Sequence, residues 1–232
     1  MKYEVNKKAR AFLSFLIKFV LLPAVVVAGA LIFRSKNYSY VIFAVTVLSL
    51  TLFFCGVDKK RTGTRRLVLS AVAVAAASLG RVLFSFIPGV NPVTAITVLF
   101  AIYLGSEAGF MIGAFSALVS NMFAGQGVWT PFQMFAWGMI GMFAGLFSSY
   151  FENHTVRLCV YTFFAGIAYS FIMDIWTVLW ANNAFSFKMY LASIISAAPY
   201  TAIYAVSNVI FTFLLAKPFS EKLGRIKIKY GI

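Results

Sequence analysis

Charge is scarce in this chain, and most of it has one sign. Only 11% of the 232 residues are charged, 62% are hydrophobic, and 20 Lys and Arg stand against 6 Asp and Glu. A soluble domain has about 25% charged residues, so the composition excludes that class and predicts an all-α integral membrane protein. The net charge of +14 could indicate nucleic-acid binding. The basic residues fall between apolar runs, however, which is typical of topology signals, and we expect no nucleic-acid partner.

Residues for catalysis and metal binding are equally few. The chain contains 1 His and 2 Cys, and it has no G-x-x-x-x-G-K-[ST], H-E-x-x-H or G-x-S-x-G motif. We therefore expect no ATPase site, no enzymatic activity, no metal and no bound cofactor. Cys55 and Cys159 are placed near the cytoplasmic face, where a structural disulfide is not expected. His154 lies in a turn, and we assign it no chemistry.

Eight apolar segments predict eight transmembrane helices. The first is too long for a signal-peptide core and lacks a clean cleavage site, so we expect it to be retained. The fourth is short for a hydrocarbon layer of about 30 Å and must be tilted or protected by neighbours. The expected helices are 12–33, 38–56, 67–87, 93–104, 106–124, 131–149, 156–180 and 189–216.

The charges between these segments divide the chain into parts. We predict an N-terminal transmembrane hairpin (1–57), a basic cytoplasmic linker (58–66), a six-helix membrane domain (67–217) and a basic cytoplasmic tail (218–232). With the N-terminus inside, 15 basic residues fall in cytoplasmic segments and 3 outside. The positive-inside rule then places both termini in the cytoplasm and the protein in the cell membrane.

One connection, 123–137, is polar and rich in glycine without being charged. Gly125 and Gly127 allow backbone angles that are closed to other residues. Thr130 and Pro131 are typical of the N-cap and first position of a helix, so a loop is expected between two helices. An interfacial turn anchored by Trp129 is the structural alternative. The side chains suited to an uncharged, partly aromatic ligand are Gln126, Trp129, Thr130 and Gln133.

Two charges, Arg81 and Asp174, lie inside apolar helices. Such residues are costly in hydrocarbon and are functional candidates by default. The expected helices place them about 10 Å and 9 Å below the same membrane face, at 1.5 Å per residue. We therefore expect them to pair, directly or through a ligand or water, as the floor of an outer cup. The alternative is that Arg81 extends to the interface and Asp174 faces water alone.

An alanine run on the first helix of the six-helix domain sets small residues four apart. Ala71 and Ala75 form one pair, and Ala73 and Ala77 form the other. This spacing lets another helix approach closely. Packing within the chain's own bundle is the alternative that the spacing alone favours.

Three runs resemble a known family: AAASLGR at 75–81, IPGVNP at 87–92 and, above all, GQGVWTPFQMFAWGMIG at 125–141. They are similar to the substrate-binding S component of an energy-coupling factor (ECF) vitamin transporter, with the cobalamin (corrinoid) type as the nearest group. The resemblance covers about 66–217, and the segment 12–56 is an addition to the family pattern.

The resemblance implies a function without covalent chemistry. Such a protein binds a vitamin at the extracellular side and docks, through small residues of its first helix, onto a transmembrane coupling subunit driven by two ATPases. Membrane lipid would surround it. The alanines at 71, 73, 75 and 77 would then form the docking face. The substrate contacts that we expect are Arg81, Asn91, Asn121, Gln126, Trp129, Thr130, Gln133, Trp137, Asp174 and Trp180.

Two other classes stay open. A stand-alone secondary transporter or channel for a small polar solute needs an ion pathway across the membrane. The intramembrane charges lie in one outer layer, however, and form no chain across the bilayer. A non-transporting membrane scaffold would leave the polar outer residues unexplained.

Overall fold

The computed structural model describes residues 2–33, 38–56, 63–182 and 184–230. Every regular element among them is helical, as the composition predicted. In chain order the elements are α1 (Lys2–Leu16), the π-helical turn η1 (Ile17–Leu21), α2 (Leu22–Phe33), α3 (Tyr38–Gly56), α4 (Gly63–Leu83), α5 (Val93–Leu104), α6 (Ser106–Ala124), α7 (Thr130–Leu146), α8 (Ser148–Phe151), α9 (Thr155–Asn182) and α10 (Phe187–Tyr230). Most of the predicted linker 58–66 lies outside the described residues.

Six helical stretches of the described residues are long and apolar enough to cross a membrane. They are Ala9–Ile32, Tyr38–Cys55, Gly63–Leu83, Ser106–Ala124, Thr155–Asn182 and Phe187–Lys229. The multi-pass membrane class is therefore confirmed, whereas the predicted count of eight crossing helices is not. The 12-residue α5 is shorter, and all its residues are buried. Burial on every side keeps this short apolar helix away from lipid.

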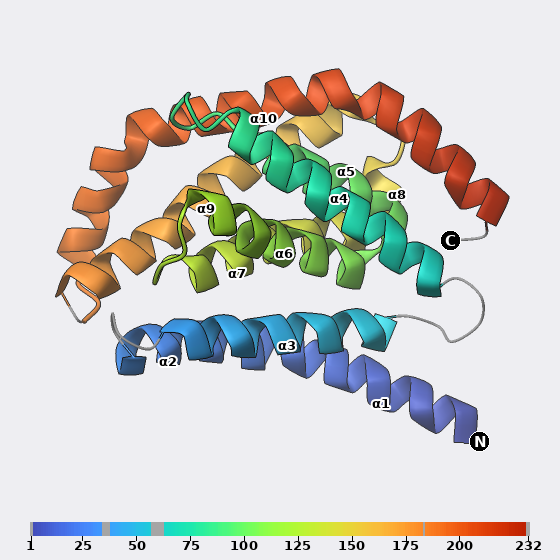
Figure 1. The fold of residues 1–232 in the computed structure, drawn as a ribbon, viewed down its shortest axis with the longest axis horizontal. Helices are drawn as coiled ribbons and strands as arrows, with labels where there is room; N and C mark the ends of the chain where they lie inside the picture. Colours follow the sequence, from blue (N-terminus) through green and yellow to red (C-terminus); the bar gives the residue numbers. More distant parts are fainter. Residues whose placement is uncertain (1, 34–37, 57–62, 183, 231–232) are drawn as a thin grey trace.

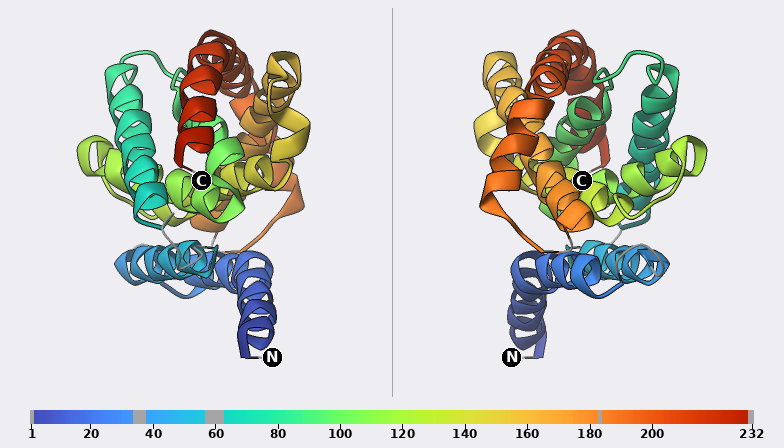
Figure 2. Two further views of the ribbon diagram at one scale, coloured as in Figure 1. Left: turned by 90° about the vertical axis from the view of Figure 1, so that its right-hand side faces the viewer. Right: turned by 90° about the vertical axis from the view of Figure 1, so that its left-hand side faces the viewer.

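The helices form a bundle with a separate layer along one side. Figure 1 shows the N-terminal hairpin (α1, η1, α2 and α3) along one side and α10 arching over the other. Both views of Figure 2 show the hairpin as its own layer. The hairpin packs on α6 and α7 through α3, and on α7 and α9 through α2. We call the end where α4 and α6 finish and α7 begins, on the left in Figure 1, the cup end.

Helices α6 and α7 run antiparallel with their backbones in contact. A Cβ atom added at Gly109 would overlap the carbonyl of Gly141, and one added at Gly113 would overlap the carbonyl of Trp137. Small residues allow such approach in membrane helices, where close packing has to replace the hydrophobic effect. This contact joins the first half of α6 to the second half of α7 and, because the helices are antiparallel, it directs the end of α6 toward the start of α7.

The last helix does not stop at the predicted end, residue 216, but continues to Tyr230. Its extension packs on the end opposite the cup, where Phe219 meets Phe100 with ring centroids 5.6 Å apart and Leu223 is buried. Lys227 forms an ion pair with Glu152 at 3.0 Å. The segment predicted only as a basic tail is therefore an amphipathic extension of α10.

An ion pair joins the hairpin to the bundle. Lys18 Nζ lies 2.8 Å from Glu107 Oε1, and the two side chains are 11% and 21% exposed. Ser14 also donates a hydrogen bond to this carboxylate oxygen, at 3.4 Å. Lys18 belongs to the π-helical turn η1, a local widening that is common at functional positions. Sequence analysis singled out neither partner.

Breaking this pair should destabilise the protein more than removing it. We expect Lys18→Met or Glu107→Gln to lower the unfolding free energy by about 3 kcal/mol, because each leaves a buried polar or charged partner uncompensated. The double variant should recover part of this loss. Unfolding of the purified protein in detergent measures all three values, and strictly additive losses would show that the pair does not couple the hairpin to the bundle.

Candidate functional site

A polar cluster lies at the cup end, between α4 and α6. Arg81, in the last turn of α4, donates hydrogen bonds from Nη1 to Ser120 Oγ and Asn121 Oδ1, both at 2.7 Å. The centre of its guanidinium lies 5.0 Å from the ring centroid of Trp137 on α7, a distance at which the aromatic face attracts a cation. Three helices thus meet around one guanidinium.

The Asn121 amide connects this cluster to the loop before α7. Its Nδ2 donates to Thr130 Oγ1 at 2.9 Å and to Gln133 Oε1 at 2.8 Å. Thr130 Oγ1 in turn donates to Gln126 Oε1 at 2.9 Å, and Gln126 Nε2 donates to the Leu118 carbonyl at 2.8 Å. Asn121 is 1% exposed, so its orientation is set by these bonds, which direct Oδ1 to Arg81.

Aromatic side chains form the wall beneath Arg81. Trp137 stacks on Tyr169 with ring centroids 4.7 Å apart, and its Nε1 donates to the Tyr204 hydroxyl at 2.8 Å. That hydroxyl also shares a hydrogen bond of 2.7 Å with Thr94 Oγ1. Tyr200 lies one turn away on α10, with its ring centroid 6.4 Å from that of Tyr204. The indole nitrogen of Trp137 and the hydroxyls of Tyr204 and Thr94 are therefore all hydrogen-bonded, as a rigid site requires.

A cavity of about 260 Å³ opens beside this cluster. Its lining includes Arg81, Ser120 and Tyr200, with Phe123 at the end of α6. Asn91, which also lines it, accepts a hydrogen bond of 3.3 Å from the Val93 amide. We call this cavity the cup. It offers one cation, several hydrogen-bonding groups and aromatic surface, which is the composition of a small-molecule site.

The structure brings together most of the predicted substrate contacts. The residues gathered around the cup and its polar cluster are Arg81, Asn91, Asn121, Gln126, Thr130, Gln133 and Trp137. The remaining three predicted contacts, Trp129, Asp174 and Trp180, do not line the cup and contact other residues.

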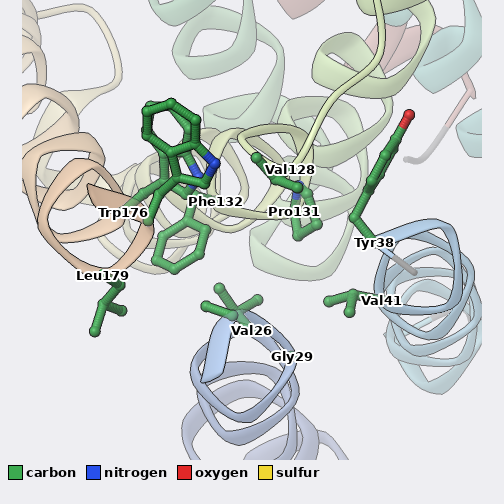
Figure 3. A pocket seen from close by; sticks show the side chains of 11 residues that line it. Val26, Gly29, Tyr38, Val41, Val128, Pro131, Phe132, Trp176 and Leu179 are labelled. Carbon is green, nitrogen blue, oxygen red and sulfur yellow. The ribbon is translucent and has the colours of Figure 1, made fainter. Parts of the chain in front are cut away.

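Trp129 and Trp180 belong to a second aromatic group. Trp176 lies between them, in edge-on contact with Trp129 at 6.1 Å and stacked with Trp180 at 6.0 Å. Trp176 and Trp180 line a crevice of about 30 Å³ between the bundle and the hairpin. Figure 3 shows this crevice, with Val26 of α2 facing the α7 and α9 side chains.

The direct pair expected between Arg81 and Asp174 is wrong. The described residues contain no ion pair between them, and Asp174 Oδ1 instead accepts a hydrogen bond of 2.6 Å from Ser193. Helix α4 does not pack on α9, so the fold does not bring the two side chains together. A pair through a ligand or water stays a prediction.

The four alanines of α4 divide between two faces. Ala73 and Ala77 are fully buried, so they pack inside the bundle, as the structural alternative proposed. Ala71 and Ala75 are exposed with the hairpin in place. Figure 2 shows the hairpin on a different side of the bundle from α4.

Sequence analysis missed several residues of the site. Tyr200 and Tyr204 stand four apart on one helix, a spacing that places both on one face and could have been used. Ser120, beside Asn121, carried no separate signal, and Tyr169 is one aromatic residue among many. The described residues contain no group of three or more His, Cys, Asp or Glu that could hold a metal. The arrangement is suited to binding by stacking and hydrogen bonds.

Comparisons with known proteins give several relatives and one family. A UPF0397 protein of Aliivibrio fischeri (strain MJ11) is 29% identical over 132 residues, which cover 54% of this chain and 67% of that protein. A UPF0397 protein of Aliivibrio salmonicida (strain LFI1238) is 26% identical over 118 residues, or 50% of this chain and 60% of that protein. No solved structure matches the chain significantly.

The family described as "ECF-type riboflavin transporter, S component" matches residues 61–221. The match begins just before α4, includes every residue named in the cup and leaves the N-terminal hairpin outside. Since it spans well over half of the chain, the chain belongs to the ECF-type riboflavin transporter S component family.

Proposed function

We propose that this protein captures a vitamin in the cup and delivers it across the membrane with the help of partner subunits. The observation that carries the proposal is the cup itself: a cavity of about 260 Å³ at one end of a membrane bundle, backed by the buried Asn121 network. The site holds groups for recognition, and the described residues around it show no nucleophile paired with a base, which covalent catalysis would require.

The size and lining of the cup favour a compact, partly aromatic ligand. Pockets for small molecules measure about 300 to 1,000 Å³, so the cup, at about 260 Å³, lies just below this range. Riboflavin, the vitamin in the family's description, is the first candidate. Cobalamin is much larger than a cavity of this size. Binding of cobalamin stays a prediction, which titration of the purified protein with cobalamin tests.

The proposed partners follow from family membership and from the exposed face of α4. We propose a transmembrane coupling subunit, energised by two ATPase subunits, that docks against Ala71 and Ala75. Both positions are exposed, and small side chains allow a partner helix to approach closely. The basic loops favour an orientation with the cup outside the cell and both termini in the cytoplasm.

Uptake should therefore depend on those partners. In proteoliposomes, we expect the chain alone to bind riboflavin but not to accumulate it. Addition of the coupling and ATPase subunits should produce uptake that requires ATP, because the chain has no phosphate-binding loop of its own. Accumulation by the chain alone, driven by a sodium or proton gradient, would favour the secondary transporter instead.

Docking should be sensitive to bulk on the exposed face of α4. We expect Ala71→Leu and Ala75→Leu to keep ligand affinity within about twofold and to lose co-purification with the coupling subunit, since a larger side chain separates two helices. Val160→Leu is the matched control, because Val160 is 53% exposed on α9. Normal assembly of both alanine variants would exclude this face from docking.

The amide network should control affinity. We expect Gln133→Ala to weaken riboflavin binding about tenfold, or about 1.4 kcal/mol, because it frees the Asn121 amide from one of its bonds. Trp180→Ala serves as the control, since Trp180 lines the hairpin crevice, and it should change affinity by less than twofold. Titration of tryptophan fluorescence measures both. Trp129→Ala, in the same assay, tests the predicted ligand contact of Trp129.

A further inference from the structure

Arg81 carries a charge that no carboxylate of the described residues balances. An arginine side chain stays protonated in proteins, and an unpaired charge in a membrane bundle is costly. The described ion pairs are Lys18–Glu107 and Lys227–Glu152. The carboxylate of Asp174 is bonded to Ser193, on a helix that α4 does not contact. Arg81, half-buried in the last turn of α4, thus differs from Lys18 and Lys227, which are both ion-paired.

The partners of Arg81 are neutral and use only one of its nitrogens. Nη1 donates to Ser120 Oγ and Asn121 Oδ1, while Nε and Nη2 donate to no atom of the described residues. A guanidinium has five N–H donors in a planar fork, so three are left. The Trp137 face attracts the cation without neutralising it.

These remaining donors belong to a side chain that lines the cup. Ser120 and Asn91 also line it and supply further polar atoms, while Tyr200, Phe123 and Ile87 supply apolar surface. The Asn121 network holds Nη1 in place from behind. The guanidinium is therefore fixed before a ligand arrives, which reduces the ordering cost of binding.

We propose that the compound bound in the cup carries an anionic group, a carboxylate or a phosphate, that pairs with the Arg81 guanidinium. A planar fork bonds either group through two parallel hydrogen bonds. The aromatic lining then holds the uncharged body of the ligand. This inference rests on the proposed function and narrows its substrate class: among flavins, the phosphate ester would bind more tightly than riboflavin.

The test compares small aromatic probes that differ only in charge. The Tm of the full-length protein in detergent is measured at constant ionic strength in the presence of each probe. Benzoate is compared with benzamide, and phenyl phosphate with phenol. We expect at least one anion, at about 10 mM, to raise Tm by several degrees. Its neutral counterpart at the same concentration should raise Tm by less than one degree. The anion with the larger shift distinguishes a carboxylate site from a phosphate site.

Variants assign the effect to Arg81. Arg81→Gln should abolish the difference between each anion and its neutral counterpart. Arg81→Lys, which keeps the charge but not the planar guanidinium, should retain a smaller difference. It replaces Arg81→Gln in the test if that variant does not fold. Arg157→Gln is the matched control, because Arg157 also covers an aromatic ring, that of Tyr150 at 4.4 Å, but is exposed and lies away from the cup.

The outcomes separate this inference from the proposed function. Equal shifts for both members of each pair, or a preference that persists in Arg81→Gln, would overturn the anionic ligand. ATP-dependent uptake of a neutral vitamin by the assembled complex would then leave the transport function standing. An anion preference in a protein that joins no coupling subunit would support the site and contradict the transport function.

Discussion

Helices α6 and α7 touch backbone to backbone, because Gly109, Gly113 and Gly141 place no side chain between them. The rest of the cup depends on this contact. It aligns α6 antiparallel to α7, so that the end of α6 lies beside the start of α7 and the Asn121 amide reaches both Thr130 and Gln133. In hydrocarbon such polar groups must find partners inside the protein. The close approach therefore provides the geometry, and the hydrogen bonds then fix it.

The N-terminal hairpin and the cup make different use of charge. The hairpin is held to the bundle by Lys18 and Glu107, which satisfy one another. At the cup end Arg81 is held by neutral groups alone. A balanced pair stabilises an interface, whereas a fixed cation with free donors is suited to recognition. The hairpin also leaves Ala71 and Ala75 exposed, so the added layer and a coupling subunit can occupy different sides of the bundle.

Much of the fold followed from local sequence. The helices 38–56, 93–104 and 106–124 were predicted with the bounds that the structure has, because glycine, proline or charge interrupts each apolar run. Polar residues in apolar helices, such as Arg81 and Asn121, were recognisable from the cost of burying them. The membrane class followed from composition, and the family followed from the loop motif, which the family match confirmed.

Only the tertiary structure decided which of these residues meet. Depth along a helix can be counted from sequence, but which helices lie side by side depends on packing, so the direct pair of Arg81 and Asp174 was predicted wrongly. The same limit separates Ala73, which is buried, from Ala71, which is exposed, and it hid the role of Tyr204. A sequence shows where polar groups stand along each helix. Their partners on other helices are chosen by how the helices pack, because the hydrocarbon offers no water to bond them.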